Sequence, residues 1–141
     1  MKRVKILILL LAIGLSACGR KDPAPLGADA PADNVPDITG SYALNGADPT
    51  GEAYGGTLTI TEGGQPNEYQ MQWLVTGAVH IGTGILEGNQ LTVTWNSYSE
   101  TDDPLSGAAK YTVTVNGELY GTRSIDGVET PGTETAYPNS K

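Results

Sequence analysis

Alternation of apolar and polar residues with a period of two constrains this chain more than any other feature. The clearest runs are residues 57–61, 69–73, 91–95 and 111–115. Each places β-branched, aromatic or other apolar residues on one side and Thr or Gln on the other, which is typical of strands with one face in water. Glycine-rich turn signals separate the runs, most clearly Asn116-Gly117. Since no comparable stretch has helical spacing, we predict an all-β fold.

The spacing of runs and turns predicts about eight antiparallel strands. They are expected at residues 38–44, 54–62, 68–75, 78–87, 90–96, 109–116, 118–123 and 132–137. Short connections favour a meander, in which each strand pairs with the next. Because open sheet edges invite aggregation, such a meander closes into a small β-barrel or folds into a two-layer β-sandwich. Glycines inside several strands suit the bends of a small barrel, so we predict the barrel.

One set of alternate residues should form the core. The chain contains no phenylalanine, so tryptophan and tyrosine must supply the bulk. The expected inward residues are Tyr42, Leu58, Ile60, Met71, Trp73, Ile85, Leu91, Val93, Trp95, Tyr111, Val113, Val115 and Leu119. This set is enough for a modest core, and it does not predict a large cavity.

The N-terminus has the three-part pattern of an export signal. Basic residues at positions 2, 3 and 5 precede an apolar run over 6–13, which is too short to span a bilayer. The tetrad that ends in Ala17-Cys18 resembles the lipobox of bacterial lipoproteins. That resemblance implies cleavage between Ala17 and Cys18, a diacylglycerol on the Cys18 sulfur and an acyl chain on its new amino group. Gly19 after the cysteine implies, by the same likeness, the outer membrane of the cell envelope.

The chain therefore divides into a signal peptide over 1–17, a lipidated cysteine with a tether over 18–36, and a small domain over 37–141. The tether is rich in Pro, Ala and Asp and has little to bury, so we expect it to be extended or disordered. Cleavage removes three of the eight basic residues and none of the sixteen acidic residues, which leaves a formal charge of −11. Such an acidic domain is not expected to bind nucleic acid.

A pattern of glycine, aromatic and turn residues covers most of residues 40–138. It includes Gly40-x-Tyr42, Asp48-Pro49-x-Gly51, Gly88-Asn89-x-Leu91-x-Val93-x-Trp95 and Asn116-Gly117-x-Leu119-x-Gly121. This pattern resembles a family of small secreted bacterial β-proteins and lipoproteins, some members of which carry the label "fibronectin-binding". Residues 38–42 and 91–96 also resemble two strands of avidin-type barrels. The second likeness implies a barrel architecture.

Few residues suggest catalysis or metal binding. His80, the single histidine, is expected on the polar face of its strand, without the partners that a general base or metal ligand requires. Glu100, Asp102 and Asp103 could hold calcium in the 97–108 loop, but Pro104 disrupts the spacing that calcium loops need. Glutamates at 62, 68, 118 and 134 could pair as in glycoside hydrolases, although the sequence does not give the distance between their carboxylates. We therefore expect no enzyme activity and no cofactor besides the lipid groups.

Two functions remain open. The first is a membrane-anchored, non-catalytic binding module for an envelope or extracellular protein, a glycan or a small ligand. The second is a structural or assembly accessory of the envelope. Because the inward residues of a small core are committed to packing, we expect any binding to use the loops. The candidate residues are Asp48, Tyr54, Tyr98, Asp102 and Asp103.

Overall fold

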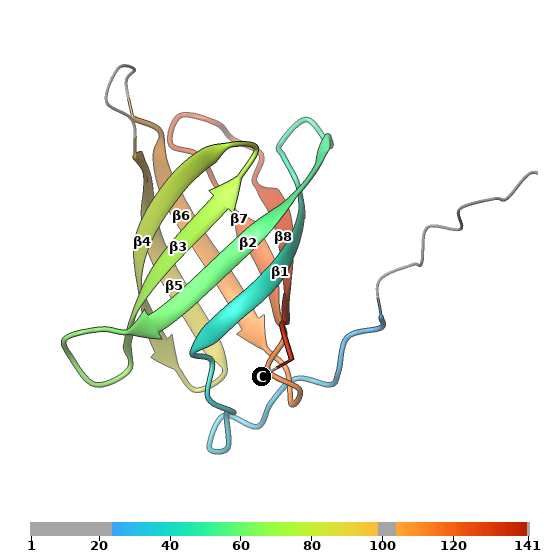
Figure 1. Ribbon diagram of the computed structural model, residues 1–141, viewed down its shortest axis with the longest axis vertical. Coiled ribbons are helices and arrows are strands. Elements are labelled where there is room, and N and C mark those ends of the chain that lie inside the picture. Colours follow the sequence, from blue (N-terminus) through green and yellow to red (C-terminus); the bar gives the residue numbers. More distant parts are fainter. Residues whose placement is uncertain (1–23, 99–103, 141) are drawn as a thin grey trace, which may run out of the picture.

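The computed structural model describes residues 24–98 and 104–140 of the chain, and it confirms the all-β barrel. Eight antiparallel strands form one closed barrel (Figure 1). They are β1 (Gly40–Ala47), β2 (Ala53–Glu62), β3 (Glu68–Val75), β4 (Ala78–Glu87), β5 (Gln90–Tyr98), β6 (Ser106–Val113), β7 (Leu119–Arg123) and β8 (Gly132–Pro138). Each strand pairs with the next along the chain, as the short connections predict.

Pairing of β1 with β8 closes the barrel, which excludes the sandwich alternative. Leu44 of β1 lies opposite Ala136 of β8 and opposite Gly56 of β2, so both edges of β1 are hydrogen-bonded to a neighbour. Closure removes the free strand edges that would otherwise invite aggregation. It also places the odd-to-even connections at one end of the barrel and the even-to-odd connections at the other (Figure 1).

The barrel interior contains most of the predicted core residues, but the prediction is wrong for Ile85 and Val115, which do not lie in the core. Their side chains are 43% and 50% exposed, respectively. Val115 lies past the end of β6, and Ile85 lies on the outer face of β4. The buried apolar residues that form the core cluster are Ile38, Tyr42, Leu44, Leu58, Ile60, Met71, Trp73, Val75, Leu91, Val93, Trp95, Ala109, Tyr111, Val113, Leu119 and Ala136.

Glycines explain why β4 has the opposite phase to the predicted one. Its inward positions include Gly82 and Gly84, whereas the apolar Ile85 faces outward. A Cβ atom on Gly82 would lie 2.7 Å from the Thr94 carbonyl oxygen and 3.0 Å from the ring of Trp73. The large side chains of the neighbouring strands therefore fill the space inside β4. Because side chains alternate along a strand, this choice turns every β4 residue to the face opposite the predicted one.

The last part of the predicted tether packs against one end of the barrel, which we call the closed end. Ala30 is 2% exposed, and its backbone N–H donates to the Val113 carbonyl at 2.9 Å. The Val115 N–H donates to the Ala28 carbonyl at 2.8 Å. Residues 27–35, called the strap below, thus run across this end and are not a free linker, contrary to the expectation for 18–36 (Figure 1). Backbone hydrogen bonds hold the strap despite its few apolar side chains.

Candidate binding site at the barrel mouth

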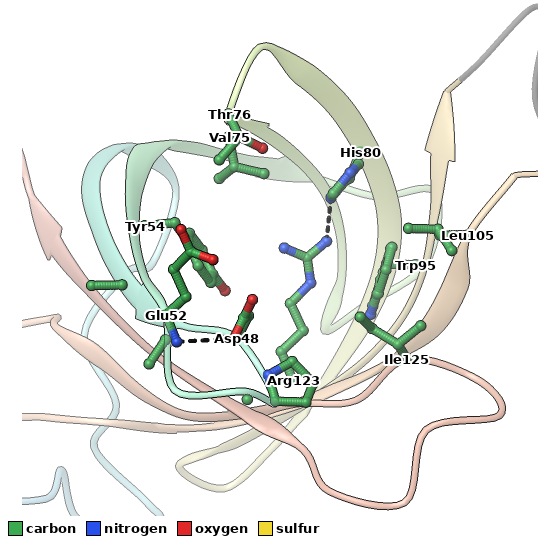
Figure 2. A pocket seen from close by; sticks show the side chains of 14 residues that line it. Asp48, Glu52, Tyr54, Val75, Thr76, His80, Trp95, Leu105, Arg123 and Ile125 are labelled. Atoms are coloured by element: carbon green, nitrogen blue, oxygen red, sulfur yellow. Dashed lines mark hydrogen bonds between the residues drawn. The ribbon is translucent and has the colours of Figure 1, made fainter.

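The end opposite the strap, which we call the mouth, contains a cavity of about 400 Å³. Residues from the β1–β2, β3–β4, β5–β6 and β7–β8 connections surround it, together with inward side chains of the strands (Figure 2). Apolar side chains form much of the wall, including Val75, Leu105, Ile125 and the ring of Trp95. Polar lining residues include Tyr54, His80 and Arg123. Such a mostly apolar cavity with a few polar groups is typical of sites for small molecules.

Glu134 lies below this cavity, on the inner face of β8, with a fully buried side chain. Its Oε1 accepts from Tyr54 Oη at 2.5 Å and from Arg123 Nη1 at 3.0 Å. Its Oε2 accepts from the hydroxyl of Tyr111 and from Trp73 Nε1, the latter at 3.3 Å. Two carboxylate oxygens offer about four lone-pair positions. The four donors therefore use the full acceptor capacity of Glu134.

Arg123 is the cation of this cluster, and its side chain is only 6% exposed. Its Cζ lies 4.0 Å from the ring centroid of Trp95 and 4.8 Å from that of Trp73, both within cation–π distance. Its Nη2 lies 2.5 Å from Nδ1 of His80 (Figure 2). The buried Nε–H has no hydrogen-bond partner among the described residues. The guanidinium is thus paired and stacked, and Nε is its one nitrogen without a hydrogen-bond partner among the described residues.

His80 points into the barrel, so the prediction that it lies on the polar face is wrong. Its ring stacks on Trp95 at 5.1 Å between centroids and 23° between planes. Because a guanidinium can only donate, Nδ1 of His80 must accept, and the neutral ring carries its proton on Nε2. Burial lowers the pKa of His80, and the positive charge of Arg123 lowers it further, whereas Glu134 opposes this effect.

Tyr54, a predicted binding residue, contributes to the floor of the site and not to a loop surface. It lies on the inner face of β2, where its hydroxyl donates to Glu134. Gly46 on β1 makes room for its ring, since a Cβ there would lie 2.4 Å from Tyr54 Cζ. Burial raises the pKa of Tyr54, and the negative charge and hydrogen bond of Glu134 raise it further.

The other predicted loop residues have different positions. Asp48 lines the mouth, but its Oδ1 accepts from Thr50 N, Thr50 Oγ1 and Glu52 N at 2.6 to 3.0 Å. The bonds from Thr50 and Glu52 lower the pKa of Asp48, and they commit this carboxylate to shaping the β1–β2 turn. Tyr98 is 65% exposed and does not line the cavity. Asp102 and Asp103 lie outside the described residues, as do Glu100, Ala17 and Cys18.

The structure separates two of the carboxylates considered for glycoside hydrolysis, those of Glu118 and Glu134. Glu118 lies in the β6–β7 connection at the closed end, where it accepts hydrogen bonds from the Thr114 hydroxyl and the Gly27 backbone. Glu134 lies toward the mouth, with its oxygens saturated. Within residues 24–98 and 104–140, no three His, Cys, Asp or Glu side chains are grouped so that they could hold a metal ion.

Sequence reasoning missed Arg123 entirely and did not place Glu134 in a site. A signal was available, because both occupy inward positions of their strands. In Leu119-x-Gly121-x-Arg123 and in Gly132-x-Glu134-x-Ala136, the residues flanking each charge face the interior. A charged residue at an inward strand position must be paired or at a functional site, because unpaired burial is costly. A pair of opposite charges on adjacent strands meets that requirement.

No protein-family model and no curated protein matches this chain. The likenesses drawn from the residues therefore remain predictions. In the described part of the chain, no helix has the length and apolar character needed to cross a membrane.

Proposed function

We propose that this protein is a membrane-anchored, non-catalytic binding module of the bacterial envelope that holds a small molecule in the barrel mouth. The observation that carries the proposal is the cavity of about 400 Å³, with apolar walls and a buried, ordered polar cluster beside it. Its volume lies in the range of about 300–1,000 Å³ that is usual for small-molecule sites. Among the options open from sequence, this favours a small ligand over a protein or a glycan.

The energetics of the cluster support a role in binding. Burying the charges of Arg123 and Glu134 costs several kcal/mol per ion before their attraction is counted, and apolar replacements of such pairs are often as stable or more stable. A small barrel that needed only stability could fill this space with aliphatic side chains. The pair instead lies beside the cavity at the mouth, next to its apolar wall, with Arg123 in the cavity lining. Polar groups in that position can orient a ligand.

The loops alone offer less for recognition. The Asp48 carboxylate is occupied within its own turn, and Tyr98 stands outside the cavity. Tyr54 contributes to the cavity from inside the barrel. We therefore place the binding site within the barrel, with the connections at the mouth forming its rim.

The anchoring part of the proposal rests on the sequence. The lipobox-like tetrad ending at Cys18 supports lipidation of that residue, and Gly19 supports the outer membrane. The acidic composition supports neither nucleic acid nor an anionic lipid surface as a partner of the domain. No cofactor besides the lipid groups is proposed.

The test is capture of small molecules by the full chain in lipid nanodiscs. The protein is incubated with the small-molecule fraction of an envelope extract, washed and analysed by mass spectrometry. Val75 projects into the barrel at the cavity wall, so Val75→Phe should fill the site and reduce capture. Tyr98→Ala, a change at an exposed side chain outside the cavity, should leave capture unchanged. Equal capture by Val75→Phe and the unmodified chain, or loss of capture in Tyr98→Ala, would contradict a site inside the barrel.

A further inference from the structure

Building on the proposed function, we infer that the mouth selects neutral ligands that present a carbonyl-type hydrogen-bond acceptor to Arg123 and His80. The acceptor is carried on a compact apolar body that fills the cavity. The inference rests on which hydrogen-bonding positions beside the cavity are occupied by the protein itself and which are free.

The carboxylate and the imidazole acceptor of the polar cluster are occupied. Glu134 provides its only carboxylate, and four protein donors occupy its two oxygens. The hydroxyl of Tyr54 directs its proton to this carboxylate. Nδ1 of His80 accepts from Arg123. A ligand that can only donate, such as an ammonium group, therefore finds no free carboxylate or imidazole acceptor in this cluster; what remains is the lone pairs of the tyrosine hydroxyl oxygens, beside the positive charge of Arg123.

Donors remain. Arg123 Nε–H is buried and has no partner among the described residues, and leaving a buried donor unpaired is costly. The neutral His80 carries its other proton on Nε2, for which the described residues provide no acceptor. Both residues line the cavity (Figure 2). A carbonyl oxygen has two lone pairs and can accept from either group, since the Nε2–H of His80 points away from the guanidinium that Nδ1 faces.

Charge favours a neutral acceptor over an anion. The charge of Arg123 is already balanced by Glu134 at 3.0 Å. A ligand carboxylate would add a second negative charge close to Glu134, and it would pass Asp48 and Glu52 at the rim. Like charges in a partly desolvated site repel strongly. An amide, ester or ketone carbonyl avoids this repulsion while keeping the acceptor.

The experiment compares three probes with one apolar body: 1-adamantanecarboxamide, 1-adamantanecarboxylate and 1-adamantanemethylamine. The cage is compact and does not absorb where tryptophan is excited. The only two tryptophans, Trp73 and Trp95, both contact Arg123, so intrinsic fluorescence reports on the site. With the full chain in nanodiscs, we expect the amide to bind about tenfold more tightly than the acid or the amine, as one well-placed hydrogen bond allows.

A variant assigns the effect to a residue. His80→Phe keeps a ring over Trp95 and removes the Nε2–H donor, so amide affinity should fall roughly three- to tenfold while amine affinity is unchanged. Tyr98→Ala is the control and should bind all three probes as the unmodified chain does. The ranking of the three probes on the unmodified chain needs no variant, so it remains decisive if His80→Phe fails to fold.

The possible failures are distinguishable. If the amine binds as well as the amide, or if the acid binds most tightly, the preference for a neutral acceptor is wrong, whereas the proposed binding cavity stands. If folded His80→Phe binds the amide unchanged, the role of His80 as donor is wrong. If none of the probes changes the fluorescence up to its solubility limit, a preference for compact apolar ligands is contradicted and this inference fails, whereas the proposed function is decided separately by the capture experiment with Val75→Phe.

Discussion

Replacing Glu134 by glutamine should destabilise the barrel more than any exposed change of the same chemistry. The variant leaves the guanidinium of Arg123, only 6% exposed, without its counter-charge. It also exchanges one oxygen that accepts two hydrogen bonds for an amide that donates. Breaking a buried ion pair on one side costs about 3–5 kcal/mol. Because whole domains are stable by only about 5–15 kcal/mol, this is a large fraction of the total.

Urea unfolding of the full chain, followed by tryptophan fluorescence and circular dichroism, measures the effect. With a slope of about 1.5–2 kcal/mol per M, the midpoint should fall by about 1.5–3 M. Glu62→Gln makes the same change at an exposed strand position and should stay within about 0.5 kcal/mol of the unmodified chain. The double variant Arg123→Met/Glu134→Gln removes both charges and should recover about 2 kcal/mol or more relative to the additive sum. The reasoning is refuted if Glu134→Gln costs no more than Glu62→Gln, or if the double variant is simply additive.

Three further predictions follow from the sequence and the barrel. Cys18→Ser should abolish labelling by a fatty-acid probe and release the protein from membranes, and persistent labelling would reject the lipobox. The lowered pKa of His80 means that the unfolded chain takes up a proton near pH 6.5, whereas the native protein does so only at lower pH. The stability of the folded protein should therefore fall as pH drops below 6.5. His80→Asn should show a smaller loss of Tm between pH 7 and pH 5 than the unmodified chain, and an equal loss would contradict this. A Cβ on Gly121 would lie 1.9 Å from the Lys110 carbonyl oxygen, so Gly121→Ala should lower the free energy of unfolding by about 1–3 kcal/mol, measured in urea. A Cβ on Gly55 would lie 3.6 Å from its nearest neighbouring atom, so Gly55→Ala should lower it by less. Equal losses would show that the barrel relaxes around the methyl group.

Much of the fold could be predicted because alternation and turn residues report directly on strands. Runs such as residues 91–95 have one bulky face and one polar face, and the structure places them in β5 with that orientation. The strand at 78–87 was predicted in the wrong phase because its outward residues, Ile81 and Ile85, are apolar and its inward glycines are small. Hydrophobicity alone cannot distinguish these faces. The bulk of Trp73 and Met71 on the neighbouring strand decides which face of β4 turns inward.

The site was harder to predict because it depends on contacts between distant residues. His80 meets Arg123 across 43 positions of sequence, and Glu134 meets Tyr54 across 80. Only the closed barrel brings β2, β4, β7 and β8 around one interior. The strap was missed for a related reason. Its composition offers little to bury, but its backbone bonds to residues 113–115 do not depend on composition.

If Cys18 carries a lipid, the strap sets the end of the barrel at which the anchor joins the domain. The strap and the C-terminal segment both lie at the closed end (Figure 1). There the Asn139 N–H donates to the Ser41 carbonyl at 2.9 Å. Eight residues lie between Cys18 and Gly27, and the nine steps along the chain reach at most about 30 Å. An anchor that joins the barrel from this side leaves the strap between the bilayer and the cavity. The mouth then opens toward the aqueous compartment, and its ligands would arrive as dissolved solutes and not by lateral diffusion from the lipid.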